Sequence, residues 1–240
     1  MKDLSQIKYS DLGFKKVPLL SSSELDHVRK LLIIKINNLL GLKLGSDERN
    51  FEEFLSNYSN EAHQKLLIKT NRILSQDESL QFIKLESIQK LISSFPGYKV
   101  GSVMHGNKTE EDRPEIYFRI VRPKMENDIG PLHCDSWFNQ LYNVPTPNGN
   151  SFKTWISIYS EPGKNGLMVV PKSHNSLWNF RKNETNDGPR PFPAFEESNL
   201  NKVLVETNPG DAIIFPCTLL HGGAVNQGRL PRVSMEITFF

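Results

Sequence analysis

Two histidines, one aspartate and one arginine form the most informative pattern in this sequence. His133 and Asp135 are two positions apart, His221 follows far downstream, and Arg232 comes eleven residues after it. Two imidazoles and a carboxylate can bind one face of an Fe(II) ion and leave three positions open. An arginine on a nearby strand suits a dicarboxylate co-substrate, because guanidinium pairs with carboxylate in a bidentate way. The spacing therefore predicts a centre for non-haem Fe(II), 2-oxoglutarate and O2.

The HxD pair needs a backbone that points both side chains to one side. On a strand, residues two apart share a face, so His133 and Asp135 are expected to share a metal while Cys134 points away. We expect His221 at the start of a late strand. An HxD pair alone is weak evidence, and a strand-end histidine capped by a carboxylate would look the same. A zinc hydrolase can also use such ligands.

The composition favours a soluble globular protein. The 240 residues are 38% hydrophobic and 23% charged, which is enough for one sizeable core. The net charge of +2 gives no reason to expect a nucleic-acid partner. No apolar run has the length of a membrane span, the first residues lack a signal peptide, and the two cysteines have no metal or redox spacing. We expect a cytoplasmic protein; its oligomeric state is not indicated.

The chain changes character near residue 96, where Pro96-Gly97 ends a helical pattern. Before it, a capping box at Ser21 and Glu24 opens the first helix. Further helices are expected over 48–57, 61–74 and 78–95. After it, short strands are expected over 99–104, 115–121, 152–159, 166–170, 202–206, 212–215 and 233–239.

The last strand alternates between a polar and an apolar face. Its polar face holds Arg232, Ser234, Glu236 and Thr238. Such a strand suggests a barrel or jelly roll with a site inside. The prediction is therefore an α+β fold, one domain over 1–240, with a mainly helical part (1–96) packed on a β core (97–240).

Two segments rich in Asn, Pro and Gly interrupt the β part. They cover 139–150 and 180–199, and both are expected to be loops beside the barrel mouth. Phe192 and Phe195 in the second segment, with Trp178 just before it, give it apolar surface to bury and favour a lid.

Several segments taken in order resemble one enzyme family. They are Gly130–Asp135, Thr154–Ser157 and Gly166–His174, followed by His221 and Arg232. This order resembles the phytanoyl-CoA dioxygenase-like (PhyH) branch of the Fe(II)/2-oxoglutarate oxygenases, from about Tyr117 to Phe240. The resemblance implies a double-stranded β-helix, a jelly roll of the cupin type. It also implies iron on His133, Asp135 and His221, and the far carboxylate of 2-oxoglutarate on Arg232.

The resemblance implies further roles around the co-substrate. Ser234 would add a hydroxyl donor, and Trp155 would lie near 2-oxoglutarate unless it is an ordinary core residue. Related halogenases need a small residue where Asp135 stands, so hydroxylation is favoured over halogenation. The chain departs from the family at Lys172, which replaces a glycine, and we expect an altered turn there with His174 in a structural role. The first half has no family motif, so a CoA-ester substrate is not implied.

The substrate residues are inferred from position. Trp137, Phe138 and Asn139 follow the HxD pair and are expected at the mouth. Tyr117 and Arg119 share a face of the preceding strand and would reach the co-substrate or a substrate anion, although Arg119 could simply pair with a surface carboxylate. The polar loop favours a small or medium polar metabolite, such as a sugar, an amino acid or a natural-product intermediate. The expected products beside the hydroxylated metabolite are succinate and CO2.

Two alternatives stay open. One is a cupin-like metal enzyme that does not use 2-oxoglutarate, in which Arg232 has no assigned role. The other is a non-catalytic β-barrel binding protein, in which His133 and Asp135 only line the interior. Metal content separates the second alternative from both enzymes.

Overall fold

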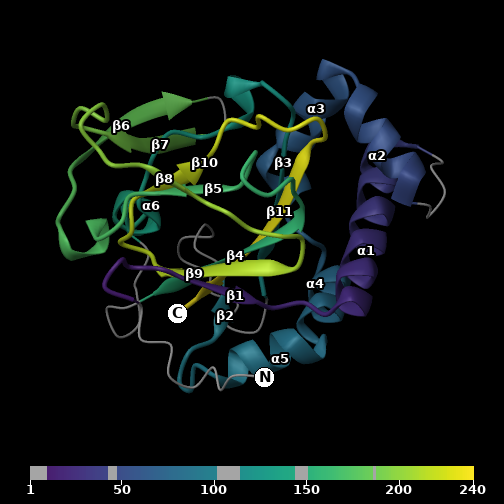
Figure 1. The fold of residues 1–240 in the computed structure, drawn as a ribbon, viewed down its shortest axis with the longest axis horizontal. Helices are drawn as coiled ribbons and strands as arrows, with labels where there is room; N and C mark the ends of the chain where they lie inside the picture. The colour runs from purple at the N-terminus through teal and green to yellow at the C-terminus, as the bar shows by residue number, and fades with distance from the viewer. Residues whose placement is uncertain (1–9, 43–47, 102–113, 144–150, 186–187) are drawn as a thin grey trace.

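The computed structural model describes residues 10–42, 48–101, 114–143, 151–185 and 188–240. Figure 1 shows helices along one side of a β structure. Some predictions fall outside the described residues. They concern the end of the expected strand over 99–104, part of the loop over 139–150, and two residues of the segment over 180–199.

The first part of the chain is helical, as the sequence predicts. Its elements are α1 (Ser22–Leu40), α2 (Glu48–Asn57), α3 (Asn60–Leu67), the 3-10 turn η2 (Lys69–Arg72), α4 (Gln76–Ile83) and α5 (Glu86–Ser93). None of the helices in the described ranges is both long and apolar enough to cross a membrane. The cytoplasmic location stays a prediction.

The capping box at the start of α1 is present and also makes a tertiary contact. The Ser21 backbone N–H donates to the Glu24 carboxylate, and the Ser21 hydroxyl accepts from the Glu24 backbone. The same carboxylate accepts hydrogen bonds from the backbone N–H (2.8 Å) and the hydroxyl (2.6 Å) of Ser87. The single helix expected over 78–95 is therefore wrong. The N–H of Ser87 turns to Glu24 instead of continuing a helix, and α5 begins anew at Glu86.

Among the described residues, a larger and a smaller antiparallel sheet form the core of the β part, and a two-stranded hairpin lies apart from them. The larger has the order β1-β9-β4-β11-β2, and β3 also pairs with β11. Its strands are β1 (Lys15–Pro18), β2 (Val100–Gly101), β3 (Ile116–Val121), β4 (Phe152–Tyr159), β9 (Asp211–Pro216) and β11 (Arg232–Phe239). The smaller has the order β10-β5-β8, with strands β5 (Leu167–Val169), β8 (Val203–Val205) and β10 (His221–Gly223). This is the expected double-stranded β-helix core.

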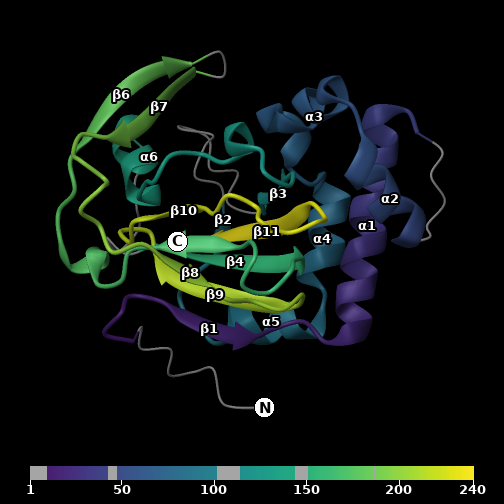
Figure 2. The same ribbon diagram turned by 45° about the horizontal axis from the view of Figure 1, so that its top comes forward.

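The large sheet has two different faces. Its outer face packs against the helices, which lie along that side in Figure 2. The cluster there joins Leu32 of α1 and Phe51 of α2 to Ile156 of β4 and Met235 of β11. The alternate residues of β11 point to the inner face, as the sequence predicts. Burial of the apolar face therefore fixes which side chains line the interior.

Two elements differ from the sequence prediction. The segment expected to be a loop over 180–199 contains a hairpin, β6 (Phe180–Thr185) with β7 (Gly188–Pro193). Prolines occupy alternate positions of β7, a pattern that normally argues against a strand. An isolated two-stranded hairpin tolerates them, because every second N–H of β7 points away from β6. The role of this segment as a lid stays a prediction.

The second difference lies at the HxD pair. His133 forms an isolated bridge, and Asp135 begins a helix, α6 (Asp135–Leu141). The strand expected at this pair is therefore wrong. The two side chains still point to the same side, because the chain is extended up to Cys134, with φ −106° and ψ 138°.

The Lys172 turn shows why the family favours glycine there. Lys172 adopts φ 67°, a left-handed conformation that costs a side chain about 1–2 kcal/mol. Its N–H donates to the Leu12 carbonyl (2.8 Å), which ties the turn to the N-terminal segment. His174 follows in this turn, and its ring packs over Gly13.

Candidate metal centre

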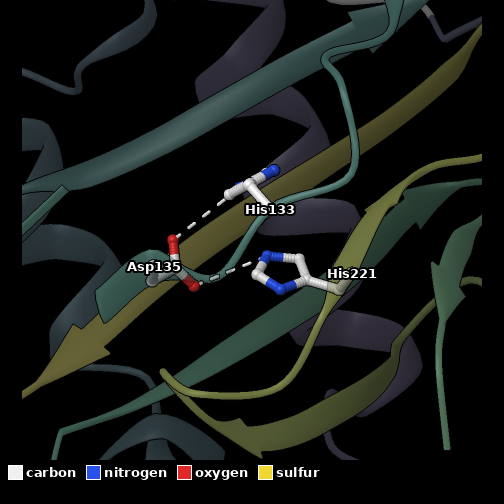
Figure 3. A group of neighbouring side chains, drawn as sticks. All are labelled: His133, Asp135 and His221. Carbon is white, nitrogen blue, oxygen red and sulfur yellow. Dashed lines mark ion pairs between the residues drawn. The ribbon is translucent and has the colours of Figure 1, made fainter. Parts of the chain in front are cut away.

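His133, Asp135 and His221 come together in the interior (Figure 3). His133 and His221 are paired across an antiparallel bridge, and each N–H donates to the other's carbonyl at 2.9 Å. Asp135 Oδ1 lies 4.0 Å from His133 Nε2, and Asp135 Oδ2 lies 3.5 Å from His221 Nε2. The three donor atoms all lie within 4.8 Å of one another. One ion could contact all three.

Hydrogen bonds orient both imidazoles so that Nε2 of each can bind a metal ion. His133 Nδ1 lies 2.9 Å from the Pro131 carbonyl, and His221 Nδ1 lies 2.9 Å from the Leu219 carbonyl. A carbonyl only accepts, so each Nδ1 carries the proton and each Nε2 keeps a lone pair toward Asp135. Burial, and then the neighbouring His221, lower the pKa of His133 to about 4. Burial also lowers the pKa of His221. Both rings are neutral at pH 7, as metal ligands must be.

The two oxygens of Asp135 have different surroundings. Oδ1 accepts a hydrogen bond from Lys153 Nζ at 2.7 Å. Oδ2 is buried and has no hydrogen-bond partner among the described residues. Burial by itself would raise the pKa of Asp135, but Lys153 and His221 hold it below its usual value. A buried carboxylate oxygen beside two imidazole lone pairs is satisfied by a divalent cation, so these residues fit a metal.

Lys153 and Glu236 are site residues that the sequence reasoning missed. Lys153 Nζ also lies 3.2 Å from Glu236 Oε2, so one buried ammonium bridges two carboxylates. Burial would raise the pKa of Glu236, but Lys153 and Arg119 lower it to about 2. Glu236 was on the polar face of the last strand, and Lys153 lies opposite Thr238 on β4. The strand register would have identified Lys153.

Arg232 is a buried cation that has no anionic partner among the described residues. It is 1% exposed, and its Nη1 donates a hydrogen bond to the Gly166 carbonyl at 3.4 Å. Nε and Nη2 have no hydrogen-bond partner in the described part of the chain, and neither has Ser234 Oγ. Burial, and then repulsion from Arg119, lower the pKa of Arg232 to about 9. The Trp155 ring centroid lies 5.5 Å from Arg232 Cζ. These groups fit a carboxylate.

The β3 strand brings two further predicted residues to the inner face. Arg119 lies opposite Ser234 and Tyr117 opposite Glu236 in the register of β3 and β11. Directly opposed residues share a face, so both side chains lie on the same face of the sheet as Ser234 and Glu236. Burial, and then the nearby Glu115, raise the pKa of Tyr117.

The three residues after the HxD pair have different surroundings. Trp137 is 2% exposed, stacks on Phe180, and donates from Nε1 to the Trp178 carbonyl at 3.0 Å. It anchors the hairpin segment instead of lining an exposed mouth. The Phe138 ring centroid lies 5.6 Å from that of His133. Asn139 is buried, and its amide N and O have no partner among the residues that the structure describes.

Both cysteines are buried and free. Burial raises the pKa of Cys217 to about 12 and also raises that of Cys134. Cys134 Sγ donates to the Thr218 carbonyl at 3.1 Å, so it points away from the three ligand atoms. Neither thiol is a thiolate at pH 7.

A family model for phytanoyl-CoA dioxygenase (PhyH) matches residues 99–234, more than half of the chain. The chain belongs to the PhyH family. The match contains the HxD pair, His221 and Arg232, so this PhyH protein is an Fe(II)/2-oxoglutarate-dependent oxygenase. The match leaves out the helices before residue 99.

Solved structures of similar fold cover nearly all of this PhyH protein. EvdO2 from Micromonospora carbonacea var. aurantiaca, complexed with 2-oxoglutarate, has a TM-score of 0.60 at 15% identity over 99% of this chain and 89% of that one. The non-heme monooxygenase ThoJ has a TM-score of 0.59 at 12% identity over 99% and 77%. EctD from S. alaskensis, with 2-oxoglutarate and 5-hydroxyectoine, has a TM-score of 0.53 at 16% identity over 95% and 71%. These likenesses show the shared fold.

Proposed function

We propose that this PhyH protein hydroxylates a small or medium polar metabolite, using His133, Asp135 and His221 to bind Fe(II) and Arg232 to bind 2-oxoglutarate. The observation that carries the proposal is the unpaired guanidinium of Arg232 beside the three-residue cluster. A cupin-like metal enzyme without 2-oxoglutarate would leave a buried cation with no partner, which is costly.

The ligand residues hold the metal in one arrangement. The backbone bridge between His133 and His221 fixes the two rings, and their Nδ1–H groups are tied to carbonyls. Lys153 occupies Asp135 Oδ1, so Oδ2 is left to face the metal. Bound iron, with 2-oxoglutarate and O2, supplies the oxidation of an unactivated C–H bond with release of succinate and CO2.

Arg232 and Ser234 are proposed to hold the far carboxylate of 2-oxoglutarate. The guanidinium offers Nε and Nη2 in a fork that matches a carboxylate, and Ser234 Oγ adds a third group. Trp155 flanks the guanidinium and keeps water away from the pair. The structures of EvdO2 and EctD are complexes with 2-oxoglutarate, which supports this role.

The substrate is proposed to lie near Phe138 and Asn139. Phe138 contacts His133, and the buried amide of Asn139 has an unused donor and an unused acceptor within the described residues. An amide of this kind suits a polar metabolite such as a sugar, an amino acid or a natural-product intermediate. SnoN, whose structure has a TM-score of 0.53, is a non-heme alpha-ketoglutarate-dependent epimerase, so the fold by itself does not choose the reaction. Hydroxylation rests on Asp135, which fills the position that halogenation requires to be open.

An anaerobic titration tests the proposal. The metal-free protein is titrated with Fe(II) and then with 2-oxoglutarate, and the visible charge-transfer band of a chelated keto acid is recorded. The band is expected in the natural protein and in Glu184→Ala, a control at an exposed acid, and is expected to be absent in Asp135→Ala. Iron binding without the band would favour the cupin-like enzyme. Binding of neither would favour the non-catalytic barrel.

Once the band is established, release of succinate against a panel of polar metabolites identifies the substrate class. A true substrate is expected to raise succinate release and to gain one oxygen atom by mass spectrometry. Loss of hydrogen without a gain of oxygen would contradict hydroxylation.

A further inference from the structure

Three arginines from three distant segments gather beside the metal centre. They are Arg72 of η2, Arg119 of β3 and Arg190 of β7. The positive charges of Arg119 and Arg190 both lower the pKa of Arg72. Like charges repel, so such a group is costly unless an anion joins it. The family match begins only at residue 99, so Arg72 lies outside it.

Separate contacts bring each arginine to this place. Arg119 lies opposite Ser234 in the strand register, which puts it on the inner face of the large sheet. Arg72 is held there by the bridge between Ile73 and Tyr117 and by the hydrogen bond from the Leu74 N–H to the Ile116 carbonyl (2.9 Å).

The hairpin carries the third arginine to the same region. The Tyr142 hydroxyl donates to the Pro189 carbonyl at 2.6 Å, which ties β7 to the end of α6 next to Arg190. Helix α6 begins at Asp135, so the contact with Pro189 connects the segment of Arg190 to the element that carries this proposed iron ligand.

Within the described residues, two of these guanidinium groups have no close anionic partner. Arg72 Nε is buried there without a hydrogen bond, and neither Arg72 nor Arg119 forms an ion pair with a described carboxylate. Glu236 raises the pKa of Arg72, and Arg119 lowers the pKa of Glu236. The ion pair of Glu236, however, is with Lys153 at 3.2 Å. Burial, and then Arg119 and Arg190, lower the pKa of Arg72 to about 10. The guanidinium groups remain charged at pH 7.

This group is separate from the position proposed for 2-oxoglutarate. Arg232 Nη1 donates to the carbonyl of Gly166, the residue before β5. The positive charge of Arg119 lowers the pKa of Arg232. The pKa of Arg72 is lowered by Arg119 as well as by Arg190. Arg119 therefore lies near both Arg232 and Arg72.

We propose that the substrate carries an oxyanion, a carboxylate or a phosphate, and that Arg72, Arg119 and Arg190 bind this group beside the metal centre. The proposal rests on the proposed function and adds the substrate class to it. Guanidinium groups bind both oxyanions through paired N–H donors. An uncharged analogue would leave Arg72 and Arg119 without a partner, so the site would select strongly against it. The proposal also gives the N-terminal helical part a role in substrate recognition, through Arg72.

Paramagnetic relaxation tests the proposal without a known substrate. The protein is loaded with Mn(II) in place of iron and saturated with 2-oxoglutarate. Phenyl phosphate, benzoate and the uncharged benzyl alcohol are then titrated, and relaxation of their phosphorus or proton signals reports binding near the metal. At least one of the two anions is expected to bind at least roughly tenfold more tightly than benzyl alcohol. Which anion binds separates phosphate from carboxylate.

Variants then locate the anion. Arg72→Gln and Arg119→Gln are each expected to weaken anion binding roughly tenfold, whereas Arg181→Gln, an exposed arginine on the same hairpin, is expected to leave it unchanged. The conservative Arg72→Lys and Arg119→Lys variants keep the charge and are expected to retain part of the affinity. Circular dichroism checks that each variant is folded, and the comparison of anion with alcohol in the natural protein needs no variant.

Two results would overturn the proposal. One is anion binding no tighter than that of benzyl alcohol, and the other is equal anion affinity in the natural protein and both glutamine variants. Failure of the proposed function looks different, because Mn(II) or 2-oxoglutarate would then not bind. In that case a phosphorus shift titration of phenyl phosphate on the metal-free protein still tests the arginine site.

Discussion

At the scale of single residues, each side chain of the centre has some polar atoms with a hydrogen-bond partner and others that are left for a ligand. One oxygen of Asp135 accepts from Lys153, and the other has no hydrogen-bond partner among the described residues. Each histidine has one nitrogen tied to a carbonyl and one directed at Asp135. In Arg232, Nη1 donates to the Gly166 carbonyl, whereas Nε and Nη2 have no hydrogen-bond partner among the described residues. Buried polar atoms without partners are costly, so they mark where a ligand completes the structure.

Lys153 is predicted to orient Asp135. In Lys153→Met, two buried carboxylates lose their shared cation, so the metal-free protein is expected to lose about 3–5 kcal/mol of unfolding free energy. The affinity for Fe(II) is expected to fall roughly 10–100-fold. Urea unfolding and Fe(II) titration at pH 7 measure both. Lys182→Met, on the exposed strand β6, is the control, and unchanged iron affinity in Lys153→Met would remove Lys153 from this role.

Arg232 is predicted to cost stability until 2-oxoglutarate binds. In Arg232→Met, removal of the unpaired buried cation is expected to raise the unfolding free energy of the protein without 2-oxoglutarate by about 1 kcal/mol. The increase in Tm that 2-oxoglutarate causes in the metal-loaded protein is expected to disappear, since a lost buried charge pair weakens binding by about 2–5 kcal/mol. Thermal unfolding with and without 2-oxoglutarate measures both. The same ligand-induced increase in Arg232→Met as in Arg181→Met would contradict the role.

At the scale of elements, short backbone contacts place the site. The bridge between His133 and His221 joins the start of α6 to β10, and the hydrogen bond from Ser136 N–H to the Cys217 carbonyl (2.9 Å) fixes the first turn of α6. Helices α1 and α5 are joined in a similar way through Glu24 and Ser87. Each contact links segments that are distant in the sequence, so the loss of one partner should affect both elements.

Glu24 is predicted to make stability depend on acid. Burial would raise its pKa, but hydrogen bonds from Ser87 and Ser21 lower it from 4.5 to about 2 in the folded protein. A lowered folded-state pKa gives stability that is present above pH 4.5 and is lost as the pH falls toward 2. Glu24→Gln is therefore expected to be less stable than the natural protein at pH 7 and to match it near pH 2. Urea unfolding across this range measures the difference; a gap that stays constant with pH would contradict it.

At the scale of the whole molecule, the helices and the large sheet share one core. Leu32 of α1 and Met235 of β11 are both fully buried in the same cluster, so neither the helices nor the sheet would keep this apolar surface covered alone. We therefore propose that the mainly helical part (1–96) and the β part (97–240) form one domain. The polar inner face lies on the other side of the same sheet.

Unfolding is predicted to be a single transition. Leu32→Ala is expected to cost about 2–5 kcal/mol and to shift the helical circular dichroism and the tryptophan fluorescence to the same new midpoint. Leu177→Ala is the control, because Leu177 is fully exposed. If the helical signal of Leu32→Ala changed at lower denaturant than the fluorescence, the two parts would be separate folding units.

The sequence by itself determined the features that depend on local pattern. Alternation in β11 and the capping box of α1 are properties of neighbouring residues, so both were predicted correctly. The ligand types and their order were also readable, since the chemistry of Fe(II) limits the choice to a few side chains. The family model confirms the class of enzyme that they indicated.

Only the tertiary structure decided which distant groups meet. Lys153 reaches Asp135, and Arg72 reaches Arg119, through strand register and a single bridge that no local pattern encodes. The start of α6 at Asp135 was missed because packing of a short segment overrides its intrinsic preference. The physical reason is common to these cases. Local periodicity reports which face of an element is buried, whereas the partners of a buried charge are set by contacts between elements.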